Sequence, residues 1–338
     1  MKILITGSRD PSASESSYAR LFREKGCDVL VWEDKAPFLL FGKRDWWRLS
    51  RAERVAYDAI ASLRFYKACR HYKPNILFMP KTENIHSHAV RRALEETGAR
   101  LVIWYPDNPF KADQTSMNIL RDLKRCDLFY IWGKFLVDAL RAAGCRRVEY
   151  LPFGFDPILH SPTELTAAKA QEYACDVCFV GTWDEERQGA LESLAGFDLG
   201  IWGPFWAEKV PTNSPLRKRI RGEGLYGNEM VAAFRSAKVV FNHLRHHNGS
   251  AHNIRTMEIT GIGGGPMIVR RTPEQATELF VEGEHLLCFE SDDELGAQVK
   301  WLLSDEQARL EMSRKAKEHV FASHLLSFRI DNILHDVS

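Results

Sequence analysis

The chain has 338 residues, and 46 Lys and Arg against 45 Asp and Glu leave a formal net charge of +1. Its composition, 45% hydrophobic and 27% charged, excludes a largely disordered chain, and the balanced charge argues against a dedicated nucleic-acid binder. Because single cores rarely grow beyond ~250–300 residues, two domains are expected.

The first half of the chain alternates short apolar runs with amphipathic stretches. Strands are predicted over residues 2–7, 27–33, 75–80, 100–106, 127–132 and 148–154, and helices over 16–26, 51–72, 86–98 and 135–144. Strands that alternate with helices indicate a parallel sheet with helices on both faces.

The second half repeats this alternation. Strands are predicted over 176–181, 197–203, 238–244, 265–271 and 286–291, and helices over 185–196, 227–237, 253–263, 272–283, 292–305 and 306–324. A polar segment with two prolines separates the halves. We therefore predict one α/β domain over 1–156, a linker over 157–174, a second α/β domain over 175–320, and a C-terminal helix over 321–338 with the option of crossing back to the first domain.

No apolar run reaches the ~18 residues of a membrane span, and the first residues lack the features of a signal peptide. A cytoplasmic location is therefore expected, with the seven scattered cysteines reduced. Cys175 and Cys178 form a lone CxxC in a strand-like run, for which a buried pair of thiols is favoured over a redox or zinc site.

Ligands of open α/β sheets bind beyond the carboxyl ends of the strands, and residues 241–270 carry the strongest signal of that kind. A strand runs into a polar loop, Asn248, Gly249 and Ser250, and then into a helix that begins near Asn253. The loop allows close approach of the backbone, and a helix start offers N–H groups and a positive dipole end. This arrangement predicts an anion site suited to a diphosphate, with Asn248, Gly249, Ser250 and Asn253 as candidate donor contacts.

Arg255 and Glu258 lie three positions apart on one face of that helix. An arginine neutralises phosphate, and a carboxylate accepts two hydrogen bonds from a vicinal diol such as a ribose. A solvated charge pair beside an ordinary glycine turn is the alternative, with about equal weight.

The same stretch holds four histidines, His243, His246, His247 and His252. Their spacing matches no common zinc pattern, so a polar loop beside an anion site is favoured and no metal site is predicted. Asp292 and Asp293 are interpreted as the first turn of a helix rather than as metal ligands.

A second candidate anion contact follows the predicted strand 176–181. Thr182 lies in the turn and Arg187 in the first turn of the next helix, where it is placed to reach the same diphosphate. The alternative, of about equal weight, is a surface pair between Arg187 and Asp184.

Four motifs resemble the spore-maturation-protein (CgeB-like) branch of the glycosyltransferases. They are WYPDNP at 104–109, VEYLPFGFDP at 148–157, DVCFVGTWDEER at 176–187, and the long run from NIRTMEITGIGGG to ESDDEL at 253–295. The resemblance is best over about 175–320 and looser in the first half.

This resemblance implies an α/β GT-B fold, in which two Rossmann-like domains face each other across a cleft. The C-terminal domain would hold a nucleotide-diphosphate sugar, and the N-terminal domain an acceptor of unknown kind: a saccharide, a lipid-linked glycan, a small molecule or a protein. The implied activity is glycosyl transfer without a metal or other cofactor, because a helix start and basic side chains stabilise the leaving diphosphate. No nucleic-acid partner is expected.

The resemblance extends to the retaining family 4 glycosyltransferases, in which two glutamates eight positions apart mark the donor site. Glu258 matches the second, which holds the ribose, whereas the first falls on Ser250 and leaves retention or inversion open. Arg187 stands where family 4 members carry a diphosphate-binding lysine. Asp107 follows a strand of the first domain near where relatives place a polar residue at the reacting sugar, and it is the catalytic candidate.

The acceptor contacts have weaker support in the sequence than the donor contacts. The candidates are Arg9, Lys81, His86, Trp46 and Trp47. The last two belong to residues 36–54, where aromatic and basic residues alternate in a way that suits a sugar face or an anionic lipid surface, hence peripheral membrane contact. A packed loop with exposed charges is the favoured interpretation of that stretch.

Two alternatives to transfer stay open at this point. A GT-B nucleotide-sugar epimerase would share the nucleotide site and need no acceptor. A non-catalytic GT-B-shaped binding module would lack turnover altogether.

Overall fold

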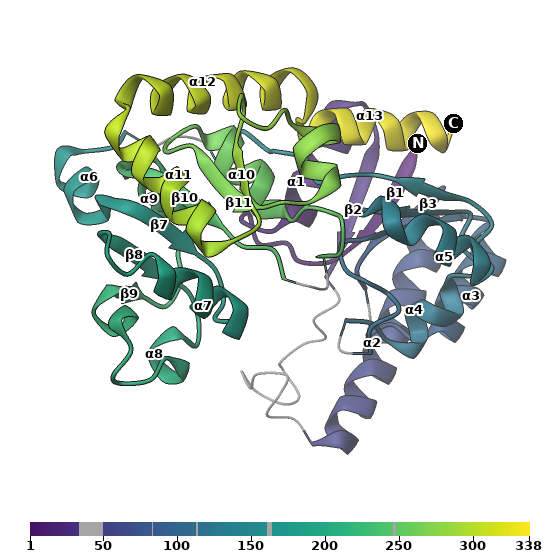
Figure 1. Cartoon of the computed structure of the whole chain (residues 1–338). Coiled ribbons are helices and arrows are strands. Elements are labelled where there is room, and N and C mark those ends of the chain that lie inside the picture. Colours follow the sequence, from purple (N-terminus) through teal and green to yellow (C-terminus); the bar gives the residue numbers. More distant parts are fainter. Residues whose placement is uncertain (34–49, 83, 113, 161–163, 246–247) are drawn as a thin grey trace. The chain divides into compact units, whose positions relative to one another are not determined.

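The structure is a computed structural model that describes residues 1–33, 50–82, 84–112, 114–160, 164–245 and 248–338. The chain divides into two compact units, Met1–Pro152 with Asp336–Ser338, and Phe153–His335. Each contains a six-stranded sheet of parallel strands flanked by helices (Figure 1). The predicted α/β class is confirmed.

The first unit has the strand order β2-β1-β3-β4-β5-β6. Its strands are β1 (Lys2–Thr6), β2 (Asp28–Trp32), β3 (Ile76–Pro80), β4 (Arg100–Tyr105), β5 (Leu128–Ile131) and β6 (Val148–Tyr150). Its helices are α1 (Ser14–Glu24), α2 (Arg51–Tyr72), α3 (Ser87–Thr97), α4 (Met117–Asp122) and α5 (Val137–Ala142). Helix α2 spans the residues predicted for it, because Ser50 and Glu53 form a reciprocal capping box at its start.

The second unit has the order β12-β11-β10-β7-β8-β9. Its strands are β7 (Cys175–Val180), β8 (Leu199–Trp202), β9 (Ile220–Gly222), β10 (Ala237–Asn242), β11 (Met267–Arg270) and β12 (Leu287–Phe289). Its helices are α6 (Ala167–Tyr173), α7 (Glu185–Ser193), α8 (Trp206–Lys209), α9 (Gly227–Ser236), α10 (Ile254–Ile262), α11 (Asp292–Ser304), α12 (Glu306–Ser323) and α13 (Leu326–Asp336), with a π-helical stretch at Glu274–Leu279.

Strand β7 shows why these runs form buried strands. Successive side chains point to opposite faces of a strand, so Val177 and Phe179 pack into one apolar cluster of the unit while Cys178 and Val180 pack into the other. Both faces are covered, which is why every residue of the strand except Asp176 is apolar, rather than every second one. Cys175 and Cys178 are buried thiols of this strand, as predicted.

Several elements were not found from the sequence. Residues 157–174, predicted as a linker, lie in the second unit, where α6 packs against α9. The basic run 216–221 holds the edge strand β9, and Arg219 and Arg221 both pair with Asp198 at 3.1 Å. By contrast, the C-terminal helix predicted over 321–338 is present as α13 (Leu326–Asp336). It ends where the chain rejoins the first unit, and there Tyr130 donates a 2.6 Å hydrogen bond to Asp336.

The strand orders place one topological switch point in each sheet. In the second unit the chain runs outward from β7 to β8 and β9, then returns to lay β10 on the other side of β7. In the first unit the corresponding neighbours are β1 and β3. Loops diverge at such a point, so the carboxyl ends of these strands are where a ligand is expected.

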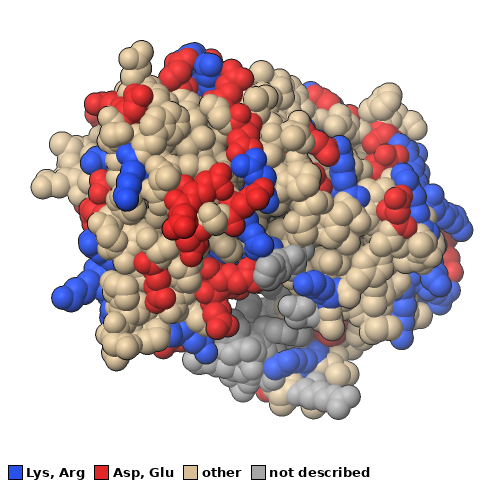
Figure 2. Space-filling view, viewed as in Figure 1, with Lys and Arg blue, Asp and Glu red and all other residues tan. Residues whose placement is uncertain are grey.

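Figure 2 shows acidic and basic side chains both spread over the visible face, as the near-zero net charge predicts. Among the described residues, no helix is both long and apolar enough to cross a membrane.

A close backbone approach beside the switch point generates a stability prediction. A Cβ added to Gly203, just after β8, would lie 1.8 Å from the carbonyl oxygen of Gly181, just after β7. Gly203→Ala is therefore expected to lower the free energy of unfolding by about 2–4 kcal/mol, since backbone must move.

The matched control is Gly296→Ala in α11, where an added Cβ meets nothing within 4 Å. It is expected to raise stability by about 0.5–1 kcal/mol, because alanine favours the helix. Urea denaturation of both variants measures the difference. Equal stability of the two variants would contradict the packing argument.

Candidate nucleotide-sugar site

Arg187, on the first turn of α7, spans the switch point of the second unit. Its Nη1 donates to the carbonyl of Thr182 at 2.9 Å, and its Nη2 and Nε donate to the carbonyl of His243, just after β10, at 3.1 and 3.3 Å. The turn after β7 and the loop after β10 are therefore joined through one guanidinium. Both predicted anion contacts, Thr182 and Arg187, lie at this edge.

The predicted alternative, a pair between Arg187 and Asp184, does not form. Asp184 instead caps α7 by accepting a 3.1 Å hydrogen bond from the Glu186 N–H, and its other oxygen lies 3.4 Å from Arg245. Among the described residues, the hydrogen bonds of Arg187 thus end on carbonyls, which leaves its full positive charge at the edge of the sheet.

The electrostatics of this edge favour an anion. The pKa of Arg187 is lowered to about 10, first by burial and then by the positive charge of Arg245, with Arg255 acting in the same direction. Positive charges near a partly buried guanidinium disfavour its charged form, and a bound anion offsets this repulsion. The three arginines come from α7, the loop after β10, and α10.

The loop between β10 and α10 is shaped by backbone hydrogen bonds. Asn248 is buried, and its amide donates to the His252 carbonyl at 3.3 Å, while Gly249 has a φ of 55° and is exposed. The Ser250 carbonyl accepts a 3.2 Å hydrogen bond from the Glu274 N–H. Gly249 is thus the part of the predicted loop that presents open backbone.

Two histidines of this stretch, His243 and His252, are described, whereas His246 and His247 lie outside the described residues. His252 is fully buried, accepts a 3.2 Å hydrogen bond from the Phe153 N–H, and has Nδ1 3.4 Å from Glu274. Within the ranges that the structure describes, no three His, Cys, Asp or Glu side chains are arranged to hold a metal ion.

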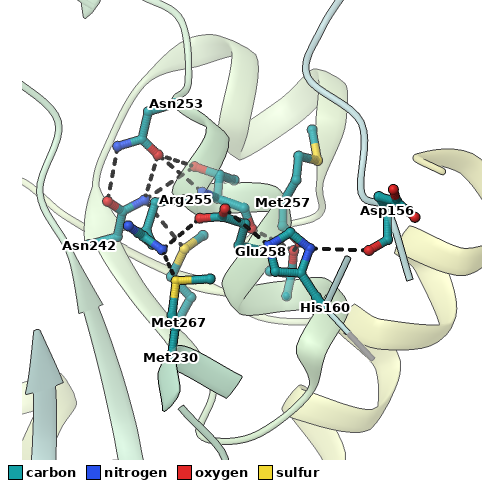
Figure 3. Close-up of polar contacts among 11 residues, drawn as sticks. Asp156, His160, Met230, Asn242, Asn253, Arg255, Met257, Glu258 and Met267 are labelled. Carbon is teal, nitrogen blue, oxygen red and sulfur yellow. Dashed lines mark hydrogen bonds and ion pairs between the residues drawn. The ribbon is translucent and has the colours of Figure 1, made fainter. Parts of the chain in front are cut away.

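Asn253 is the N-cap of α10. Its Oδ1 accepts a 3.0 Å hydrogen bond from the Thr256 N–H, and its amide pairs reciprocally with that of Asn242, the last residue of β10, at 3.0 and 3.1 Å (Figure 3). The side chain predicted to contact the donor therefore fixes the start of the helix against the strand before it.

Arg255 and Glu258 form the predicted pair, 2.7 Å apart, on one face of α10 (Figure 3). The Arg255 guanidinium also contacts the Met230 sulfur and lies 5.7 Å from the ring centre of Phe234, both on α9. The solvated pair offered as the alternative is wrong, because Glu258 is only 9% exposed.

Glu258 has a second partner, His160, that was not predicted from the sequence. His160 Nε2 lies 3.2 Å from Glu258 Oε1, and its ring stacks on Phe155 with centres 5.4 Å apart. Burial acts to raise the pKa of Glu258, but Arg255 and His160 outweigh it, so the net pKa is lowered and the side chain is a carboxylate. The residue lies in the predicted linker, where no periodic pattern points to a ligand site; only its place after the LPFGFDP motif was visible.

The remaining candidates lie in the first unit, at the carboxyl edge of its sheet. Lys81, after β3, forms an ion pair with Asp107, after the neighbouring β4. Thr6 and Thr82 share a hydrogen bond across the switch point between β1 and β3. The catalytic candidate and one acceptor candidate are thus brought together.

Other acceptor candidates are more scattered. Arg9 donates to the Val31 carbonyl at 3.1 Å, beside β2. His86 is the N-cap residue of α3, and its N–H donates to the Ser62 hydroxyl at 2.8 Å. Trp46 and Trp47 lie outside the described residues.

Residues 186–335, which lie in the second unit, match the family model described as Glycosyl transferase-like. No curated protein sequence matches the chain significantly.

Solved structures match over the full length. Sucrose-phosphate synthase from Thermosynechococcus elongatus is 13% identical, with a TM-score of 0.69, and the match covers 99% of this chain and 98% of that one. Anabaena HepE, solved with UDP and glucose, is 14% identical, with a TM-score of 0.66 and coverage of 100% and 99%. The fold is GT-B. A putative UDP-N-acetylglucosamine 2-epimerase from Listeria monocytogenes shares it, at 14% identity, a TM-score of 0.61 and coverage of 98% and 94%.

The family match includes Arg187, Arg245, Arg255 and Glu258, whereas Thr182 and His160 lie before its first residue.

The double role of Asn253 generates a second prediction. Asn253→Ala removes the helix cap and both hydrogen bonds between Asn253 and the buried Asn242 amide, which keeps the Thr256 hydroxyl at 3.2 Å. We therefore expect a loss of about 2–3 kcal/mol of unfolding free energy. Ser291→Ala, which removes only the cap of α11, is the control, with an expected loss of about 1 kcal/mol. Equal losses in urea titrations would show that the amide pair adds nothing.

Proposed function

We propose that this protein transfers a glycosyl group from a nucleoside-diphosphate sugar to an acceptor. The family match over residues 186–335 and the GT-B fold support nucleotide-sugar glycosyl transfer. The observation that carries the proposal is one edge of the second sheet, where burial and the charges of Arg245 and Arg255 lower the pKa of Arg187. The buried, ionised Glu258 pairs there with Arg255.

Each group has a role in this proposal. Arg187 and Arg255 offset the charge of the diphosphate, with Gly249 and the start of α10 presenting N–H groups to it. Glu258 accepts two hydrogen bonds from the ribose diol. The same cations stabilise the charge that develops when the bond between the sugar and the diphosphate breaks, so we propose transfer without a metal.

On the acceptor side we propose Asp107 as the residue at the reacting sugar. An acceptor oxygen forms the new bond to the anomeric carbon and loses its proton as the nucleoside diphosphate leaves. Lys81 pairs with Asp107 and orients it. Arg9, His86, Trp46 and Trp47 are proposed acceptor contacts.

The donor's base is proposed to be uracil, since HepE was solved with UDP. The motifs quoted from the sequence support placing the protein in the CgeB-like branch. Because Ser250 carries no carboxylate, contacts to the sugar hydroxyls must come from other groups than in family 4.

Glu258→Gln tests the ribose assignment. The amide keeps the size of the side chain but loses the charge and one acceptor, so we expect UDP to bind about tenfold more weakly or worse by calorimetric titration. Glu311→Gln on α12, an exposed glutamate paired with Arg314, is the matched control and should bind UDP as the wild type does. Unchanged affinity of Glu258→Gln would overturn the role.

Epimerisation is the second candidate, because the Listeria epimerase shares the fold. Incubating UDP-glucose or UDP-N-acetylglucosamine with the protein and no acceptor separates the two. We expect NMR spectra of the sugar to show no isomeric product. An isomer would favour the epimerase.

A thermal-shift measurement with UDP, GDP, ADP and CDP tests for a non-catalytic module. A ligand at ~100 times its Kd adds roughly 2.7 kcal/mol to the free energy of unfolding, so failure of all four to raise the Tm would favour that module.

A further inference from the structure

His160 is flanked by two hydrogen-bond acceptors, one at each ring nitrogen. Nδ1 lies 3.1 Å from the backbone carbonyl oxygen of Asp156, and Nε2 lies 3.2 Å from Glu258 Oε1 (Figure 3). A carbonyl only accepts, and so does an ionised carboxylate. The Asp156 carbonyl oxygen also accepts a 3.1 Å hydrogen bond from the His160 backbone N–H. A neutral imidazole has a single N–H, so its other ring nitrogen would present a lone pair to an acceptor oxygen, whereas the imidazolium donates to both.

The surroundings of the ring also suit a cation. His160 is 7% exposed, and the Phe155 ring stacks on it at an angle of 19°. The charged groups that face it are Glu258 from α10, with Arg255 on the far side of that carboxylate, and Asp156 from its own segment. The Asp156 carboxylate accepts a 3.0 Å hydrogen bond from the Ile158 N–H.

We propose that His160 is held as an imidazolium that positions the Glu258 carboxylate for a ribose diol, so that ribose recognition weakens when that proton is lost. The part concerning ribose rests on the proposed function, whereas the protonation of His160 does not. His160 is a positioning residue, since it acts on the nucleotide through Glu258.

The direction of the pH effect follows from the folded state. Burial acts to lower the pKa of His160, but the Glu258 carboxylate and the Asp156 carbonyl raise it, and the net pKa lies above the usual 6.5. The extra proton is therefore held to a higher pH than on an unperturbed histidine and leaves as the pH rises through this raised pKa. Its stabilising contribution is complete below 6.5 and is lost in the alkaline direction.

The first test needs no nucleotide. Long-range ¹H–¹⁵N correlation spectra of the histidine-labelled full chain, assigned with His160→Gln, report the state of both ring nitrogens. We expect both to carry protons at pH 7, and the titration midpoint to fall in Glu258→Gln. One unprotonated nitrogen at pH 7 would overturn the proposal, whatever the protein binds.

The second test measures the Kd of UDP and of 2′-deoxy-UDP between pH 6 and 8.5. The Kd of 2′-deoxy-UDP divided by the Kd of UDP isolates the contact to the ribose 2′-hydroxyl from titration of the phosphates. In the wild type we expect this ratio to fall at least threefold as the pH rises. In His160→Gln, which keeps one N–H donor but no charge, the ratio should be lower at pH 6 and independent of pH. His335→Gln, an exposed histidine of α13 in the same unit, should behave as the wild type does.

The two tests separate the proposals. A pH-independent ratio in the wild type, or an unchanged pH profile in His160→Gln, would overturn the positioning role even with an imidazolium present. If UDP does not bind at all, the ribose role fails together with the proposed function, and the spectra still decide the protonation of His160.

Discussion

The second unit is organised around a buried carboxylate. Moving an unpaired carboxylate out of water costs several kcal/mol, so Glu258 stays ionised in α10 only with cations beside it. One comes from its own helix, Arg255, and the other from the segment before α6, His160. Arg255 in turn lies against Met230 and Phe234 of α9. Compensating one charge therefore ties three separate stretches of the chain to the edge of the sheet.

Arg187, unlike Glu258, has no oppositely charged side chain as a hydrogen-bond partner in the part of the chain that the structure describes. Arg187 is held by two carbonyls rather than by a carboxylate, and its neighbours Arg245 and Arg255 lower its pKa. A structural ion-pair network would place a carboxylate there, as Asp198 does for the two arginines of β9 and its preceding turn. Within the described ranges, Arg187 alone of the three arginines thus has no direct carboxylate partner, because Arg245 pairs with Asp184 and Arg255 with Glu258. Its charge costs stability and suits the binding of an anion.

Several features were accessible from the sequence for local reasons. Short apolar runs identify β7 and β10, and a capped helical stretch identifies α10, because strand burial and helix capping depend on neighbours in the chain. The pairing of Arg255 with Glu258 follows from the helical repeat. By contrast, spacing gave no means to decide between Asp184 and the carbonyls as partners of Arg187, since that choice depends on where the loop after β10 lies.

Sequence by itself determined the alternation of strands and helices, the polar ends of the strands, and the face of α10 that carries the charges. Tertiary structure decided which strand ends are neighbours: the return of the chain from β9 to β10 sets Arg187 beside His243, and brings His160, some 98 positions earlier, to Glu258. It also gave Asn253, a candidate ligand contact, the role of the cap that joins α10 to β10. The reason is physical: period and capping act within a few residues, whereas the partner of a buried charge is set by whichever distant segment the packed core brings within about 3 Å.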